Sequence, residues 1–148
     1  MPISEVEYLK ERLEDQINWY DKKSTKCQKY YKWHKVIEIT AAALIPILAA
    51  QSSSFKAVAI IISILGSAIV VIEGLVNLGK YHENWIEYRS VSETLKQEKY
   101  MYLTQSGVYK TSKEDAFELL VERIESVISK ENVNWANLHS NKKGDDKK

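Results

Sequence analysis

The sequence is poor in the residues that interrupt helices and in the residues that cross-link a chain. Its 148 residues include five glycines, two prolines and one cysteine. Pro2 is terminal and Pro46 lies within an apolar stretch, so little stands in the way of continuous helix. Cys27 alone excludes an internal disulfide and is too few for a cysteine zinc site. These shortages predict an all-α protein that is not stabilised by disulfide bonds or by a structural metal ion.

The motifs of enzyme chemistry are also missing. We find no glycine-rich phosphate loop, no paired-histidine metal motif and no nucleophile elbow. The three histidines, His34, His82 and His139, are scattered along the chain. We therefore predict a protein that is not an enzyme and that needs no cofactor and no metal.

Charge is balanced overall but strongly segregated. The net charge is +1 and the mean hydropathy is −0.35, values that suit a soluble protein. Between residues 36 and 78, however, only Glu38, Lys56 and Glu73 are charged. A soluble helical bundle spreads apolar residues as stripes over all its helices. Segregation of this kind favours a membrane hairpin over the alternative, a buried helical hairpin inside a soluble bundle.

Two apolar runs are long enough to span a bilayer. At about 1.5 Å per residue, Ala57–Leu78 reaches roughly 33 Å. Val36–Ala50 is shorter, but it reaches about 30 Å when counted from Tyr31, across an aromatic and lysine-rich flank that suits the interface. We predict spans at 36–50 and 57–78, joined by an external loop at 51–56.

Helical patterns continue on both sides of the spans. Ser4 and Glu7 form a capping-box pattern, which predicts one long helix from Ser4 to about residue 50, cytoplasmic over 4–35 and bent at Pro46. The second helix is expected to continue from the second span through a cytoplasmic extension at 79–106. A third cytoplasmic helix is expected at 112–138, within a single domain over 1–140. The charged tail 141–148 is expected to be disordered.

Six lysines with no acidic residue among them precede the first span: Lys22, Lys23, Lys26, Lys29, Lys32 and Lys35. Such a run can bind nucleic acid or anionic lipid. Its position directly against a span favours a lipid collar, and no nucleic-acid partner is expected. By the positive-inside rule both termini are cytoplasmic. The first 35 residues are too polar for a cleavable signal peptide, so the first span is expected to direct its own insertion.

Acids and small polar residues inside the spans are the candidate functional residues, as pore lining or subunit contacts. They are Glu38, Ser63, Gly66, Ser67, Glu73, Gly74 and Asn77. With the turn centred between Ser52 and Ser53, Glu73 faces Lys32 and lies within a turn of Lys35, as in an interfacial ion pair. Glu38 would face Ser67 at greater depth, where a carboxylate is costly and is by default a functional candidate. Two helices cannot enclose a pore, so any conduit requires a homo-oligomer.

One set of residues resembles a known family. The set is Glu73-Gly74, Trp85-Ile86-Glu87-Tyr88-Arg89, Leu95, Glu98, Tyr109, Glu122, Glu125, Glu131 and Trp135. In this pattern the chain is similar, over roughly residues 5–138, to the SLATT family. These are bacterial two-span proteins that have also been described as a domain of unknown function.

The resemblance implies an effector role in bacterial conflict systems. SLATT proteins are proposed to act beside nucleotide-signal synthases or sensors and to disable an infected cell through a membrane pore. This chain carries no recognisable nucleotide-sensing domain, so the sensor would be a separate protein or the cytoplasmic bundle itself. The implied location is the bacterial inner membrane, crossed more than once.

Some of the resembling residues also suit a structural network: Trp85, Tyr88, Arg89, Glu98, Glu122, Glu125 and Trp135. We expect Arg89 to pair with Glu122, Glu125 or Glu98 and so to lock the third helix in place. The function expected from the sequence is an oligomeric, pore-forming membrane effector of antiviral defence. The alternative is a membrane-anchored helical module that recruits a cytoplasmic partner.

Overall fold

The computed structural model describes the backbone of residues 3–50 and 56–140, and the side chains of residues 3–50 and 57–131. The expected external loop, apart from Lys56, and the expected disordered tail lie outside these residues. So does the side chain of Trp135. Within the described part the chain is helical and has no strand, which confirms the predicted all-α class.

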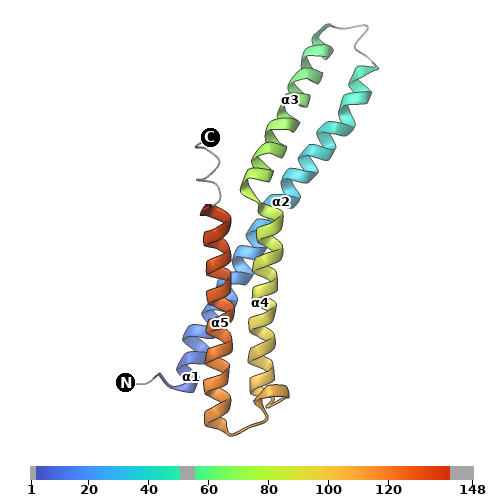
Figure 1. Cartoon of the computed structure of the whole chain (residues 1–148). Coiled ribbons are helices and arrows are strands. Elements are labelled where there is room, and N and C mark those ends of the chain that lie inside the picture. Colours follow the sequence, from blue (N-terminus) through green and yellow to red (C-terminus); the bar gives the residue numbers. More distant parts are fainter. Residues whose placement is uncertain (1–2, 51–55, 141–148) are drawn as a thin grey trace. The chain divides into compact units, whose positions relative to one another are not determined.

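The helices follow one another with short connections (Figure 1). Their bounds are α1 (Glu5–Glu7), a π-helical segment (Tyr8–Leu13), α2 (Glu14–Ala49), α3 (Lys56–Gly79), α4 (Tyr81–Leu103), a 3₁₀ turn (Gly107–Tyr109) and α5 (Lys113–Ser140).

The N-terminal end is capped as the sequence predicts. The Ser4 hydroxyl accepts the Glu7 backbone N–H at 3.3 Å, and the Glu7 carboxylate accepts the Ser4 N–H at 3.4 Å. The next turns are π-helical, with the Glu14 N–H bonded to the Leu9 carbonyl. Sequence patterns gave no sign of this extra residue in the turn. It places Tyr8 and Leu13 in the core.

The chain forms two compact units. The first, here called the bundle, combines residues 1–22 with residues 87–148, and in it α4 and α5 pack with the N-terminal helix. Its core is mainly hydrophobic, with Ser92, Glu98 and Glu131 as buried polar members. The buried hydrophobic members are Tyr8, Leu13, Ile17, Tyr20, Leu95, Tyr102, Tyr109, Ala116, Leu120, Ile124 and Ile128. Leu13, Leu95, Tyr109, Leu120 and Ile124 are fully buried, so apolar burial is the main force that holds this unit together.

The second unit, here called the hairpin, is residues 23–86. In it α2 and α3 lie side by side (Figure 1). Each helix turns one half-buried face toward the other. On α3 this face comprises Val58, Ile62, Leu65, Ile69, Ile72 and Val76. The remaining apolar residues are exposed, among them Ile60, Val70 and Leu75 at 59–72%. Within the described residues, one helix, beginning at Ala57, is long and apolar enough to cross a membrane, and its apolar part is not buried within the chain.

The second long helix is not continuous, contrary to the sequence prediction. α3 ends at Gly79 and α4 begins at Tyr81, because Lys80 adopts a left-handed conformation with φ of 46°. A Cβ at Gly79 would lie 2.4 Å from Cε2 of the Tyr81 ring. That ring also faces Tyr30, with centroids 5.7 Å apart, and His34, at 6.4 Å. Gly79 therefore leaves the space in which Tyr81 can reach the aromatic side chains of α2.

This arrangement predicts an asymmetry between two glycines of α3. Gly79→Ala should lower the free energy of unfolding by about 1–3 kcal/mol relative to Gly74→Ala, because only the first new methyl group overlaps a packed ring. The gain in helix propensity is smaller at Gly79, the last residue of α3, than at Gly74 in its interior, and this adds to the difference. Thermal unfolding in detergent measures the difference. Equal melting temperatures for the two variants would contradict this account of the break.

Candidate functional site in the hairpin

Two carboxylates of the hairpin share one lysine. Lys35 Nζ lies 2.9 Å from Glu38 Oε2 and 2.8 Å from Glu73 Oε2. Asn77 Nδ2 donates to Glu73 Oε1 at 3.4 Å. The side chains of Lys35, Glu38 and Glu73 are 32%, 20% and 38% exposed. The group, here called the ion triad, joins α2 to α3 and carries one more negative than positive charge.

The ion triad confirms one expectation and corrects another. The predicted partner of Glu73 at the hairpin base was Lys32 or Lys35, and it is Lys35. Glu38, for which the sequence offered no structural partner, has one in Lys35. Lys35 and Glu38 are three residues apart on one helix, a spacing that places them on the same face. The expected register across the hairpin does not reveal this partner, because Lys35 lies on the same helix as Glu38.

A polar cavity of about 270 Å³ adjoins the ion triad. It is lined by Tyr31, Lys35, Glu73, Val76, Asn77, His82 and Glu83. The net negative charge of the triad therefore faces a space that can hold water. Among the described residues there is no group of three or more histidine, cysteine or acidic side chains that could hold a metal ion.

The small and polar residues of α3 divide between two faces. Gly66 and Glu73 are half-buried, at the edge of the face toward α2. The others are exposed and form what we call the polar stripe: Ala59, Ser63, Ser67, Gly74 and Asn77. At 3.6 residues per turn, the polar stripe lies roughly a third of a turn from the face that packs on α2. It is therefore not used in packing the hairpin.

At one end the polar stripe adjoins two exposed isoleucines, in an open surface formed by Ala59, Ile60, Ser63, Ile64 and Ser67. The hydroxyl of Ser63 donates to the Ala59 carbonyl at 3.0 Å, and that of Ser67 to the Ser63 carbonyl at 2.8 Å. These hydroxyls are thus satisfied as donors and can still accept hydrogen bonds. Next around the helix comes a face that is exposed and wholly apolar, formed by Ile61, Ile64, Ala68, Val71 and Leu75.

Five of the six collar lysines, all but Lys35, are exposed. Lys32 Nζ lies 5.8 Å from the centroid of the Trp85 ring, and Lys26 Nζ lies 5.9 Å from that of Tyr30. Lys32 is therefore not the partner of Glu73. Trp85 also packs edge-on against His82, with ring centroids 5.7 Å apart. Trp85 thus belongs to the hairpin and not to a network in the bundle.

The expected pairing of Arg89 was wrong. Arg89 binds Asp21 at 3.0 Å and Glu93 at 2.8 Å, not Glu98, Glu122 or Glu125. Asp21 also accepts from Lys96 and from the Ser92 hydroxyl, so this contact joins α4 to α2 and does not involve α5. The family pattern contains Arg89 but neither Arg12 nor Arg123, which bind Glu125 and Glu98.

The overlooked arginines hold α5 to the rest of the bundle. Arg123 donates from Nε to Glu98 Oε2 at 2.9 Å and from Nη2 to Glu98 Oε1. The Tyr109 hydroxyl also donates to Glu98, which is only 6% exposed. Arg12 donates two hydrogen bonds to the Glu125 carboxylate, at 3.0 and 2.8 Å. Paired donors of this kind are the strongest hydrogen bonds that a carboxylate accepts.

The remaining members of the expected network stand apart. Tyr88 packs against Trp19 and Tyr20, with ring centroids 5.9 and 6.1 Å apart. Glu122 is exposed. Glu131, in contrast, is 6% exposed and accepts from the Tyr20 hydroxyl at 3.0 Å. The residues expected to form one network therefore belong to several separate contacts.

Glu98 and Glu125, the two acids bound by arginines, should make the stability of the bundle depend on acidic pH. Hydrogen bonds from Arg123 lower the pKa of Glu98, and those from Arg12 lower the pKa of Glu125. Their stabilising effect is complete above the unfolded-state pKa of about 4.3 and is lost as the pH falls below it toward the lowered native pKa values. Melting temperature should therefore fall as the pH is lowered below about 4.3. The melting temperature of Glu98→Gln should fall less steeply over this pH range than that of the unmodified protein. Equal slopes would contradict the assignment of the acid sensitivity to Glu98.

Comparison with known proteins places the chain in a family. A family model described as a protein of unknown function, DUF4231, matches residues 15–116. The chain belongs to the DUF4231 family. The matched residues include the polar stripe, all three members of the ion triad, and Glu98. No curated protein and no solved structure matches the chain.

Proposed function

We propose that this DUF4231 protein is an oligomeric, pore-forming effector of the bacterial inner membrane. The observation that carries the proposal is the exposed polar stripe on a helix that is apolar and long enough to cross a bilayer. From Ala59 to Asn77 the stripe extends over about 27 Å, close to the thickness of the hydrocarbon core, and the exposed Val70 is an apolar residue within it, between Ser67 and Gly74. Small and hydroxyl-bearing residues on a spanning helix suit contact with other helices or with water better than contact with lipid.

The order of faces around α3 supports an assembly of several copies. One face packs on α2, the next is the polar stripe, and the third is the exposed apolar face of Ile61, Ala68 and Val71. Several hairpins around a common axis would turn the polar stripes inward and the apolar faces toward lipid. One hairpin cannot do this, because two helices leave no enclosed path.

The proposed topology has two spans and cytoplasmic termini. The first span, 36–50, would cross beside α3 within the hairpin, with Trp33 exposed at its inner end. Lysines flank the hairpin base, and Lys56 is the one lysine between the spans. The positive-inside rule then places the base in the cytoplasm. The resemblance to SLATT proteins adds the biological setting: a conflict system whose trigger is a nucleotide signal or a separate sensor protein.

Ion efflux from liposomes tests the proposal. The purified chain, reconstituted with and without candidate nucleotides, is expected to release ions. Ser63→Leu/Ser67→Leu should abolish most of the efflux by filling the polar stripe, whereas Ala68→Leu on the apolar face should leave it unchanged. Absence of efflux under all conditions, or equal losses in the two variants, would contradict a pore along the stripe.

A second candidate is a membrane-anchored module that recruits a cytoplasmic partner. It is favoured by large apolar side chains left exposed on the bundle. These are Ile3, Val6, Tyr100, Leu103 and Val108, at 51–73% exposure. Replacing both spans with an unrelated helical hairpin separates the two candidates. Preserved cellular activity would favour recruitment, and lost activity would favour the pore.

A further inference from the structure

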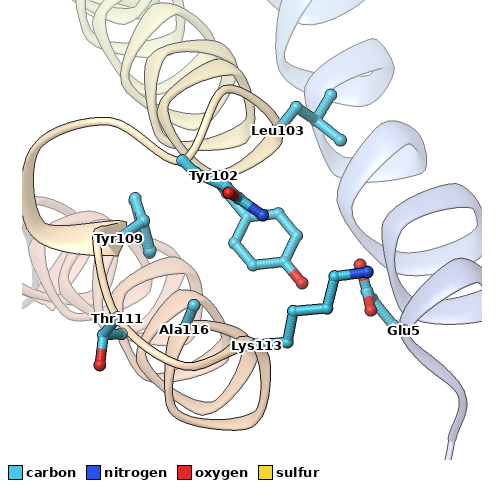
Figure 2. Close-up of a pocket in the computed structure, with 8 residues that line it drawn as sticks. Glu5, Tyr102, Leu103, Tyr109, Thr111, Lys113 and Ala116 are labelled. Atoms are coloured by element: carbon cyan, nitrogen blue, oxygen red, sulfur yellow. The ribbon is translucent and has the colours of Figure 1, made fainter.

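Four polar or charged regions of the molecule stand outside the pore proposal. In the bundle, a cavity of about 150 Å³ lies between Glu5, Tyr102, Tyr109 and Lys113 (Figure 2). Its groups already interact, since burial and the neighbouring Glu5 carboxylate raise the pKa of Tyr102 to about 12. At the ion-triad cavity Glu73 is paired with Lys35, and the buried Glu131 accepts from the Tyr20 hydroxyl. Lys26, Lys29 and Lys32 of α2 differ from these groups, because no described carboxylate pairs with them.

Three exposed lysines of the hairpin lie apart from acidic side chains. In the part of the chain that the structure describes, no acid lies within ion-pair distance of Lys26, Lys29 or Lys32, while Lys35 is occupied by the ion triad. The sequence between Lys22 and Lys35 contains no acid at all. We call these three exposed lysines, Lys26, Lys29 and Lys32, the lysine belt.

The lysine belt leads directly into an aromatic level and then into the apolar span. Lys26, Lys29 and Trp33 follow at steps of three and four residues, which places them on one face of α2. Trp33 is 65% exposed, and it lies about 6 Å further along the helix than Lys29. Val36 and Ile39 continue the exposed surface as purely apolar residues, at 57% and 66% exposure. Tryptophan is enriched where the headgroups meet the hydrocarbon, so the lysine belt lies at the depth of the headgroups.

Two of these ammonium groups are held near that aromatic level. Lys26 lies over Tyr30, which is 46% exposed, and Lys32 lies over Trp85. Both contacts leave the ammonium groups able to donate hydrogen bonds outward. A surface that is cationic on one side of Trp33 and apolar on the other fits the boundary of a bilayer. A nucleic acid would require the cationic surface to extend without an adjoining apolar one.

We propose that the lysine belt binds the phosphate groups of anionic phospholipids in the inner leaflet. The proposal rests on membrane insertion, as proposed above, but not on pore formation. Each lysine near an anionic surface strengthens its binding by about fivefold, and the effect falls with rising salt because the charges are screened. The protein should therefore prefer anionic to zwitterionic lipids among its immediate lipid neighbours.

Quenching of tryptophan fluorescence by brominated lipids tests this preference, because Trp33 lies one turn from Lys29. The full chain is reconstituted in phosphatidylcholine vesicles that contain brominated phosphatidylglycerol or brominated phosphatidylcholine. Lys26→Gln/Lys29→Gln should reduce the preference for the anionic quencher by about 25-fold. Lys110→Gln/Lys130→Gln removes the same charge from exposed positions of the bundle and should leave the preference unchanged. Trp33→Phe should reduce the quenching, and the part that remains should come from other tryptophans such as Trp85 beside Lys32.

The outcomes are distinct. An unchanged preference in Lys26→Gln/Lys29→Gln, or an equal loss in the bundle variant, would overturn the proposal. Binding of a short duplex DNA or RNA to the solubilised chain, lost in the same variant, would reassign the belt to nucleic acid. Absence of quenching by either brominated lipid would contradict insertion itself. Quenching without any ion efflux would leave the lipid belt standing while the proposed pore fails.

Discussion

Replacing Glu98 with alanine should lower the free energy of unfolding of the bundle by about 3 kcal/mol. Glu98 is 6% exposed and accepts hydrogen bonds from Arg123 and from the fully buried Tyr109. Its removal leaves the Tyr109 hydroxyl buried without its acceptor and frees the guanidinium that ties α5 to α4. Loss of a charge-assisted hydrogen bond and of the acceptor for a buried donor together account for this magnitude. Urea unfolding in mild detergent, followed by near-ultraviolet circular dichroism, measures it.

Glu122 provides the matched control. It is the same residue type on α5, but it is exposed. Glu122→Ala should change the free energy of unfolding by less than about 0.5 kcal/mol. If the two alanine variants were equally stable, Glu98 would not be a structural centre of the bundle. Arg123→Met should be at least as destabilising as Glu98→Ala, because it leaves the buried Glu98 carboxylate without its counter-ion.

Replacing Lys35 with methionine should prevent stable formation of the hairpin. Glu38 and Glu73 would then face each other's charge at the edge of an apolar span with no cation between them. Unpaired carboxylates in or near a membrane are strongly unfavourable. Melting temperature in detergent and the yield of inserted protein should both fall well below those of Lys32→Met, which removes an exposed lysine one turn earlier.

Neutralising the acids should reverse the effect. Lys35→Met/Glu38→Gln/Glu73→Gln should recover most of the stability, because no unpaired charge remains. Glu38→Gln alone should be tolerated, since it leaves one lysine with one carboxylate. If the triple variant were as unstable as Lys35→Met, lost packing and not lost charge pairing would explain the phenotype.

Local patterns in the sequence predicted the parts of the fold that depend on local chemistry. The capping box at Ser4 and the apolar length of α3 are set by residues within a few turns of each other, so both were predictable. The partner of Glu73 was also predictable, because a tight hairpin fixes the register of its two helices. That register placed Glu73 opposite Lys32 and within a turn of Lys35, and the structure shows that the partner is Lys35.

The features that were missed depend on competition between distant groups. Arg89, Arg12 and Arg123 could each pair with several acids, and only the packed bundle decides among them. The break at Lys80 arises because the Tyr81 ring reaches Tyr30 and His34, a contact that sequence spacing does not reveal. The π-helical turn at Tyr8–Leu13 likewise follows from burying both of its ends. The resemblance pointed to Glu98 and Glu125 but not to the arginines that bind them.

The most direct test of the proposed pore is chemical modification of its wall. Single cysteines are introduced at Ser63 on the polar stripe and at Ala68 on the apolar face, in a Cys27→Ser background. The reconstituted channels are then treated with a charged, water-soluble thiol reagent while ion efflux is recorded. A pore along the polar stripe predicts that modification at position 63 blocks efflux and that position 68 remains unreactive. Reaction at position 68 with no effect at position 63 would contradict it.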